Sequence, residues 1–149
     1  MKTYAKTINE YQLKKIKSDI QSAKITSSKE AADYARQFYF DDIEIYESVF
    51  IMLLNRQNNV EGYVKISQGG TAGTVVDVKL ITKYAVDSLS SSVIMIHNHP
   101  SGNTQPSEPD KNMTTKIKTA LNLFEINLLD HVIITPGDKY FSLADEGMI

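Results

Sequence analysis

The chain contains no cysteine, and it has only three histidines among its 149 residues. Disulfides, thiolate zinc sites and cysteine nucleophiles are therefore excluded, and any metal ion has to be held by histidine, aspartate or glutamate. The sequence also lacks an apolar run long enough to span a membrane, and it lacks a charged start that leads into an apolar signal core. We expect a cytoplasmic protein without a membrane partner.

A strong charge of either sign is missing as well. The net charge of -2 provides no global attraction to nucleic acid, although it is compatible with a local basic patch. Hydrophobic residues make up 42% of the chain and charged residues 23%, which is ordinary for a folded domain and argues against disorder. The length fits one domain with a single core.

Residues 1–40 are predicted to form a helical extension that precedes the main domain at residues 41–149. Three apolar residues recur at helical spacing with lysines between them, namely Leu13, Ile16 and Ile20. A serine, Ser27 or Ser28, is suited to cap a second helix. The apolar face of that helix would comprise Ala31, Ala32, Ala35 and Phe38.

The main domain alternates predicted strands with predicted helices, which indicates a layered α/β fold. Apolar or β-branched runs predict strands at 49–54, 62–67, 74–78, 93–96, 128–135 and 140–143. Amphipathic spacing predicts helices at 80–89 and 109–124. The sequence has no internal repeat and no low-complexity tract.

One segment carries the residues best suited to hold a metal ion. His97 and His99 lie two apart at the end of a predicted strand, so their side chains project from the same face. The loop that follows contains proline and glycine and can bring Asp110 back to the same point. Two nitrogens and one oxygen suit zinc, and three protein ligands leave a fourth position for water. Zinc lowers the pKa of that water to about 7, so hydroxide becomes available near neutral pH.

Each part of this pattern also has a simpler interpretation. Paired histidines at the end of a strand are often polar loop residues that bind no metal. Ser107 and Asp110 have the spacing of a capping box, and Pro109 suits the first turn of a helix. The two interpretations are compatible, because a helix start would fix the position of Asp110 while the loop presents it to the histidines.

A hydrolytic site also needs a general base near the water, and glutamate is the usual base in zinc hydrolases. Three glutamates flank the first buried strand, namely Glu44, Glu47 and Glu61. Spacing alone leaves the choice among them open. Each of them is also explained as a solvated carboxylate at the end of a strand.

The spacing of the whole set resembles the JAMM motif of the MPN+/JAB metalloprotease family. In that motif, His-x-His is followed after seven residues by serine and after two more by aspartate, as at positions 97–110 here. The longer string His-Asn-His-Pro-Ser-Gly, followed by Pro-Ser-x-x-Asp, resembles the RadC-type branch of this family. Further similarity to RadC-type sequences lies at Asn55, in the glycine-containing segment 69–74, at 128–131 (Leu-Leu-Asp-His) and at 140–142 (Tyr-Phe-Ser).

This resemblance implies a fold, a cofactor and a set of residue roles. The implied fold is a single α/β domain with a curved, mixed but mostly antiparallel sheet flanked by helices, akin to the cytidine-deaminase architecture. The implied zinc ligands fall on His97, His99 and Asp110. The general base falls on Glu47, and the residue that holds the water or the oxyanion falls on Ser107.

The chain departs from full-length RadC-type proteins in one respect. Those proteins carry an N-terminal helix-hairpin-helix region, whereas only a short lysine-bearing stretch precedes residue 41 here. This departure weakens the expectation of DNA binding. The remaining histidine, His131, follows Asp130 at the start of a predicted strand, and we expect it to make a structural hydrogen bond rather than to bind the metal.

Three functions are compatible with the sequence. The first is a zinc hydrolase that cleaves an amide or isopeptide bond in a peptide or protein, with segment 69–74 close to an extended substrate. The second acts on nucleic acid in repair, recombination or antirestriction, and the negative net charge counts against it. The third is a non-catalytic accessory module whose zinc serves folding only. The oligomeric state is left open.

Overall fold

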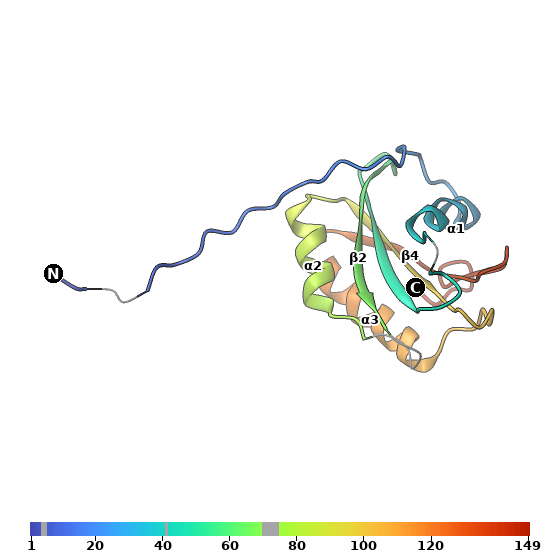
Figure 1. The fold of residues 1–149 in the computed structure, drawn as a ribbon. Helices are drawn as coiled ribbons and strands as arrows, with labels where there is room; N and C mark the ends of the chain where they lie inside the picture. The colour runs from blue at the N-terminus through green and yellow to red at the C-terminus, as the bar shows by residue number, and fades with distance from the viewer. Residues whose placement is uncertain (4–5, 41, 70–74) are drawn as a thin grey trace.

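A five-stranded sheet forms the centre of the protein, with helices on both faces (Figure 1). This computed structural model describes residues 1–3, 6–40, 42–69 and 75–149. The described elements are α1 (Ser28–Ala35), the 3-10 helix η1 (Arg36–Phe38), β1 (Ser48–Leu54), β2 (Val60–Gln68), α2 (Val78–Asp87), β3 (Ser92–Asn98), α3 (Glu108–Asn122), β4 (Asn127–Ile134) and β5 (Tyr140–Ser142). Within these ranges, no helix combines the length and the apolar character that crossing a bilayer requires.

The sheet has the strand order β2-β1-β3-β4-β5. Strand β1 pairs antiparallel with β2 and with β3, and β4 pairs antiparallel with β5. The β3–β4 pair alone is parallel among the described strands, because helix α3 connects these two strands across one face. The predicted α/β domain with a mixed, mostly antiparallel sheet is therefore confirmed.

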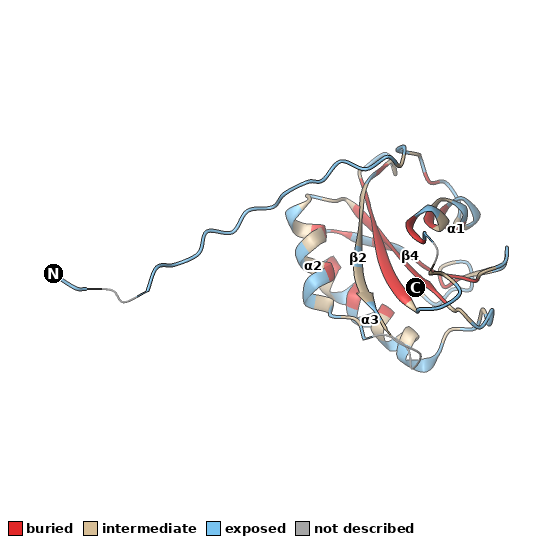
Figure 2. Cartoon of the chain, in the orientation of Figure 1, coloured by how far each residue is buried: buried red, intermediate tan, exposed pale blue. Residues whose placement is uncertain are grey.

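Two apolar layers sandwich the sheet, and Figure 2 shows the buried residues gathered along its central strands. Because side chains alternate along a strand, Phe50, Met52 and Ile94 face helix α1, while neighbouring residues face α2 and α3. All seven residues of β1 and all seven of β3 are buried. Burial on both faces explains why these strands appear as continuous apolar runs in the sequence.

The helix predicted within residues 1–40 from the spacing of Leu13, Ile16 and Ile20 is wrong. Residues 6–27 contain no helix, and Figure 1 shows the first part of this N-terminal arm running away from the domain. Ile8, Tyr11 and Ile16 are 96%, 87% and 89% exposed. An isolated helix of this length is marginal in water unless its apolar side packs against something, and these side chains have no such surface. The arm joins the domain where Val60 N–H donates to the carbonyl of Ala23 at 2.9 Å.

The second predicted helix is confirmed as α1. The Ser27 hydroxyl caps it by accepting from Glu30 N–H at 3.1 Å, as the serine-capping prediction requires. Its three buried alanines pack against the sheet in the same cluster as Phe50 and Met52. Helix α1 thus contributes directly to the core, while the division of the chain at residue 41 stays a prediction.

The strand predicted at 74–78 is also wrong where the structure describes it. Residues 75–77 have no strand conformation, and Val78 already begins α2. The Asp77 side chain accepts from Lys79 N–H at 2.9 Å and so starts the helix, which overrides the β-branched pattern. Thr74 lies outside the described residues, as does most of segment 69–74, for which a substrate contact was suggested.

Candidate metal centre

The two histidines of the motif lie where the sheet is widest. His97 is the penultimate residue of β3, paired with Val49 of β1 on one side and Ile133 of β4 on the other, and it is 1% exposed. His99 follows the strand, and its N–H still donates to the carbonyl of Ile134 at 2.9 Å. This pairing keeps the backbone extended, so both imidazoles face the same way with their Nε2 atoms 2.9 Å apart.

The hydrogen bond of His99 shows which of its nitrogens is free for a ligand. Its Nδ1 lies 2.6 Å from the carbonyl oxygen of Asn103, in the loop after β3. A carbonyl only accepts hydrogen bonds, so Nδ1 carries the proton. Nε2 is then the nitrogen of this ring that a metal ion can bind, and it lies 2.9 Å from Nε2 of His97. Hydrogen bonding with Asp110 is the main cause that raises the pKa of His99 above its ordinary value.

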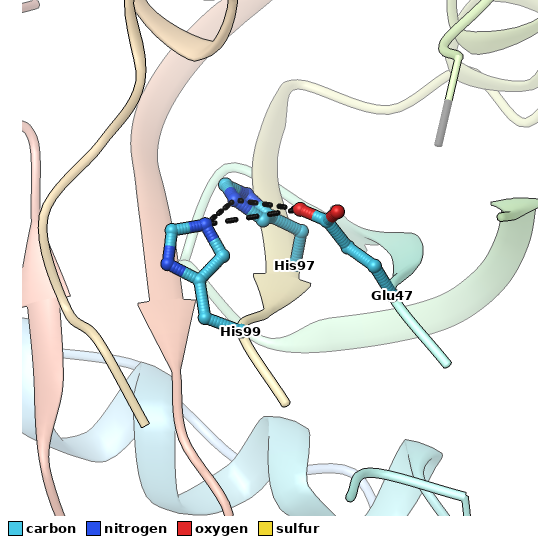
Figure 3. A group of neighbouring side chains, drawn as sticks. All are labelled: Glu47, His97 and His99. Carbon is cyan, nitrogen blue, oxygen red and sulfur yellow. Dashed lines mark hydrogen bonds and ion pairs between the residues drawn. The ribbon is translucent and has the colours of Figure 1, made fainter. Parts of the chain in front are cut away.

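Glu47 is the one of the three candidate glutamates that the fold places at these histidines. Its Oε1 lies 3.7 Å from Nε2 of His97 and 3.7 Å from Nε2 of His99, as Figure 3 shows. Glu61 accepts instead from the side chain of Asn55 at 2.6 Å, beside the β1–β2 turn. Glu44 is exposed in the turn before β1.

Asn98 explains why Glu47 reaches the site, and the sequence reasoning missed it. Its side chain leaves β3 on the face opposite His97 and is completely buried. Its Oδ1 accepts from Ser48 N–H, and its Nδ2 donates to the carbonyls of Ile43 and Tyr46, each at 2.8 Å. These bonds hold the irregular segment that ends at Glu47. The available signal was the position of an amide residue between two histidines on a buried strand.

Asp110 is held by the start of helix α3. The Ser107 hydroxyl accepts from Asp110 N–H at 3.1 Å, and Asp110 Oδ2 accepts from Ser107 N–H at 2.8 Å. This is the capping box anticipated from the sequence, with Pro109 in the first turn. The same Oδ2 lies 3.6 Å from Nε2 of His97 and of His99. The cap and the approach to the histidines therefore coexist.

The histidines dominate the electrostatics of Asp110. Burial raises the pKa of its carboxyl group, but hydrogen bonds with His97 and His99 outweigh burial. The net result is a pKa far below the ordinary value, so the carboxylate stays ionised. Ser107 itself is exposed, and its role as an oxyanion partner stays a prediction.

The geometry of these four side chains fits a metal ion. The ligand atoms of Glu47, His97 and His99 all lie within 4.8 Å of one another, and Asp110 Oδ2 adds an oxygen near both imidazoles. Atoms about 2.0–2.1 Å from a tetrahedral zinc are about 3.4 Å apart, which the observed separations bracket. A cation bound here would also balance the negative charge of the two carboxylates beside the imidazole nitrogens. The predicted set of His97, His99 and Asp110 is brought together, with Glu47 beside it.

His131 contacts the cluster through Nδ1 of His97, the ring nitrogen that does not face His99. It is fully buried, its Nε2 lies 2.6 Å from Nδ1 of His97, and its Nδ1 lies 2.6 Å from Oγ1 of Thr114. Burial lowers the pKa of His131 well below the ordinary value. As expected, His131 makes hydrogen bonds rather than facing the cluster. Asp130 is a separate buried acceptor, which takes hydrogen bonds from the His131 N–H and from the hydroxyl of Ser142.

Fold and site together define a class of protein, namely a compact α/β domain with a candidate metal centre at the end of a central strand. The model of the RadC-like JAB domain family matches residues 25–148. The chain belongs to this family, as the resemblance of its motif implied.

Several curated relatives, all called UPF0758 proteins, support the same family. The protein of Flavobacterium johnsoniae is 42% identical over 125 residues, which cover 84% of this chain and 53% of that protein. That of Porphyromonas gingivalis is 41% identical over 103 residues, covering 69% of this chain and 45% of its own length. That of Clostridium beijerinckii is 39% identical over 138 residues, covering 92% and 57%. The chain spans about half the length of the curated relatives it matches.

Proposed function

We propose that this domain is a zinc-dependent hydrolase that cleaves an amide or isopeptide bond in a peptide or protein. The observation that carries the proposal is the position of the Glu47 carboxylate, 3.7 Å from Nε2 of both His97 and His99. A carboxylate at the edge of a histidine cluster can exchange a proton with a water in the cluster. Membership of the RadC-like JAB family supports this proposal, since hydrolysis is the chemistry that its motif implies.

The two carboxylates differ in a way that divides their roles. Asp110 is clamped by the Ser107 N–H, and its side chain is 13% exposed, so it suits a fixed ligand. The Glu47 side chain extends from an irregular segment and is 22% exposed, so it is accessible to water and substrate. We assign His97, His99 and Asp110 as the residues that hold zinc, and Glu47 as the general base.

Each residue then has one task in the reaction. Zinc, when bound, supplies Lewis acidity that polarises a carbonyl and lowers the pKa of water. Glu47 accepts the proton of the attacking water and passes it to the nitrogen of the leaving amine. The exposed hydroxyl of Ser107 donates to the oxygen of the carbonyl as negative charge develops on it.

Replacing Glu47 with glutamine tests this assignment. Glu47→Gln keeps the size of the side chain but removes the base, so we expect turnover to fall by at least about 100-fold while zinc stays bound. Fluorogenic peptides and lysine-linked isopeptides provide the activity readout, and elemental analysis provides the zinc content. The matched control is Glu61→Gln, the same change beside the β1–β2 turn, which should leave turnover unaltered. Wild-type activity in Glu47→Gln would refute the role of Glu47.

A further inference from the structure

A chain of buried hydrogen bonds connects helix α3 to the back of His97. It begins at the backbone carbonyl of Asp110, to which the Thr114 hydroxyl donates at 2.7 Å. Thr114 Oγ1 is 2.6 Å from Nδ1 of His131, and Nε2 of His131 is 2.6 Å from Nδ1 of His97. Thr114, His131 and His97 are 2%, 0% and 1% exposed, so water cannot replace any of these contacts.

The fold aligns the chain by the register of two strands and the pitch of one helix. In the parallel β3–β4 pair, His131 lies opposite Met95, two residues before His97 and on the same face. Thr114 lies one helical turn after Asp110 on α3, which covers that face. The two imidazole rings are tilted by 53° with their centroids 4.7 Å apart, so they meet through nitrogens rather than by stacking.

The first link determines the direction of every other link. A hydroxyl has one proton, and the Asp110 carbonyl can only accept, so the Thr114 proton points at that carbonyl. Thr114 Oγ1 then accepts, and Nδ1 of His131 must donate to it. Neutral His131 is left with a bare Nε2, which accepts from Nδ1 of His97. Neutral His97 is left in turn with a bare Nε2 that faces His99.

The other protonation patterns are disfavoured by the same contacts. If Thr114 donated to His131, two oxygen lone pairs of Thr114 and Asp110 would face each other at 2.7 Å. A doubly protonated His131 would place a positive charge in a fully buried position among hydrogen-bond partners that are all uncharged. Both patterns would put a proton on Nε2 of His97, where it would block a metal.

We propose that His131 is a positioning residue that holds His97 in the Nδ1–H tautomer and thereby keeps Nε2 available for zinc. The inference rests on the proposed function only for the statement that Nε2 is a zinc ligand. The tautomer itself is a property of the metal-free fold. Partners that orient a histidine ligand in this way contribute about 10- to 100-fold to metal affinity when they are present. Here the partner is a second imidazole, that of His131. Thr114 anchors this ring, and Thr114 itself is hydrogen-bonded to the backbone of the proposed ligand Asp110.

The direct test needs no variant. Nitrogen-15 NMR of the metal-free wild-type protein distinguishes a protonated imidazole nitrogen from a bare one. We expect protons on Nδ1 of His97 and of His131, and bare Nε2 atoms on both of these rings. A proton on Nε2 of His97 would overturn the proposal. Because this result does not involve zinc, it stays decisive even if the proposed hydrolase function fails.

Zinc affinity provides the second test, measured by competition with a chromophoric chelator. We expect His131→Leu to weaken binding about 10- to 100-fold, since His97 loses its acceptor. His131→Gln should recover part of that loss, because a glutamine amide oxygen can occupy the position of Nε2 and accept from His97. Circular dichroism shows whether each variant is folded. A folded His131→Leu variant that binds zinc within twofold of wild type would contradict the proposal.

A substitution at Thr114 perturbs the buried site less than one at His131, and the same substitution at Thr119 provides a matched control. Thr114→Val keeps the shape but removes the oxygen that anchors His131, so we expect zinc affinity to fall about 10-fold and the NMR signals to show mixed tautomers. Thr119→Val removes a similar hydroxyl from the exposed side of α3, one that donates to the Thr115 carbonyl at 3.0 Å. It should change neither readout. Equal effects of the two variants would mean that the chain does not act through His131.

Discussion

The end of strand β3 buries polar side chains, whereas the N-terminal arm exposes apolar ones. At β3, the polar residues His97 and Asn98 are buried, and both are hydrogen-bonded. In the arm, the apolar residues Ile8 and Ile16 are almost fully exposed. A buried polar group is costly without a partner, whereas an exposed apolar group costs little. Stability and function should therefore depend on the first region and hardly on the second.

The largest effect is expected where a buried polar side chain loses its partners. Asn98→Leu leaves Ser48 N–H and the carbonyls of Ile43 and Tyr46 without their partner, so we expect unfolding free energy to fall by about 4 kcal/mol. Urea unfolding measures the change. Asn112→Leu, on the exposed side of α3, is the control and should stay within about 0.5 kcal/mol. If Asn98→Leu lowered the unfolding free energy by less than about 1 kcal/mol, stability would not depend on the buried polar residues of β3 as we propose.

Zinc should stabilise the β3 region in a concentration-dependent way. At a free zinc concentration 100 times its Kd, linkage predicts about 2.7 kcal/mol of added stability. Differential scanning calorimetry with zinc, and after addition of a chelator, measures this as a shift in Tm. His99→Ala should abolish the shift, because a ligand is gone. An unchanged shift in that variant would place the zinc elsewhere.

A smaller effect is expected at Tyr39, whose buried hydroxyl donates to the Ser48 carbonyl at 2.9 Å. Burial, reinforced by the charges of Asp42 and Glu47, raises its pKa well above 10.0. The folded state therefore holds this proton more tightly than the unfolded state, so the stabilisation is complete below about pH 10 and is lost as pH rises through the folded pKa. Tyr39→Phe should cost about 1 kcal/mol at neutral pH and flatten the alkaline decline in urea titrations. Tyr11→Phe, in the arm, should leave that decline as steep as in wild type.

The smallest effect is expected in the arm. Ile16→Ser alters a side chain that is 89% exposed, so the change in unfolding free energy should stay within about 0.5 kcal/mol. The same substitution at Ile81, which is 0% exposed, should cost several-fold more. A loss above about 1 kcal/mol for Ile16→Ser would show that this exposed part of the arm packs against the domain.

The same contrast explains how far the sequence predicts the structure. The buried strands were predictable because apolar runs at 49–54 and 93–96 reflect burial on both faces. The proximity of His97, His99 and Asp110 followed from strand alternation and a helix cap, which are local properties. The helix predicted in the arm failed because helical spacing forms a helix only where another surface covers its apolar side.

Other parts of the site depend on contacts between distant segments. Asn98 holds the segment before β1 across 50 residues of chain, and no spacing rule predicts that pairing. Thr114 and His131 meet 17 residues apart only after β4 has paired with β3. Among the glutamates, the choice of Glu47 required the motif resemblance, and the structure gives the physical reason in the hydrogen bonds of Asn98.

Zinc analysis of matched variants tests the central claim most directly. Purified wild-type and Glu47→Gln proteins, exposed to excess zinc and then desalted, should each retain one zinc per chain. X-ray absorption should show two imidazole nitrogens among its ligands, and the His99→Ala protein should retain no zinc. Wild-type protein without zinc, or a His99→Ala protein that keeps it, would contradict the assignment of this cluster as the metal centre.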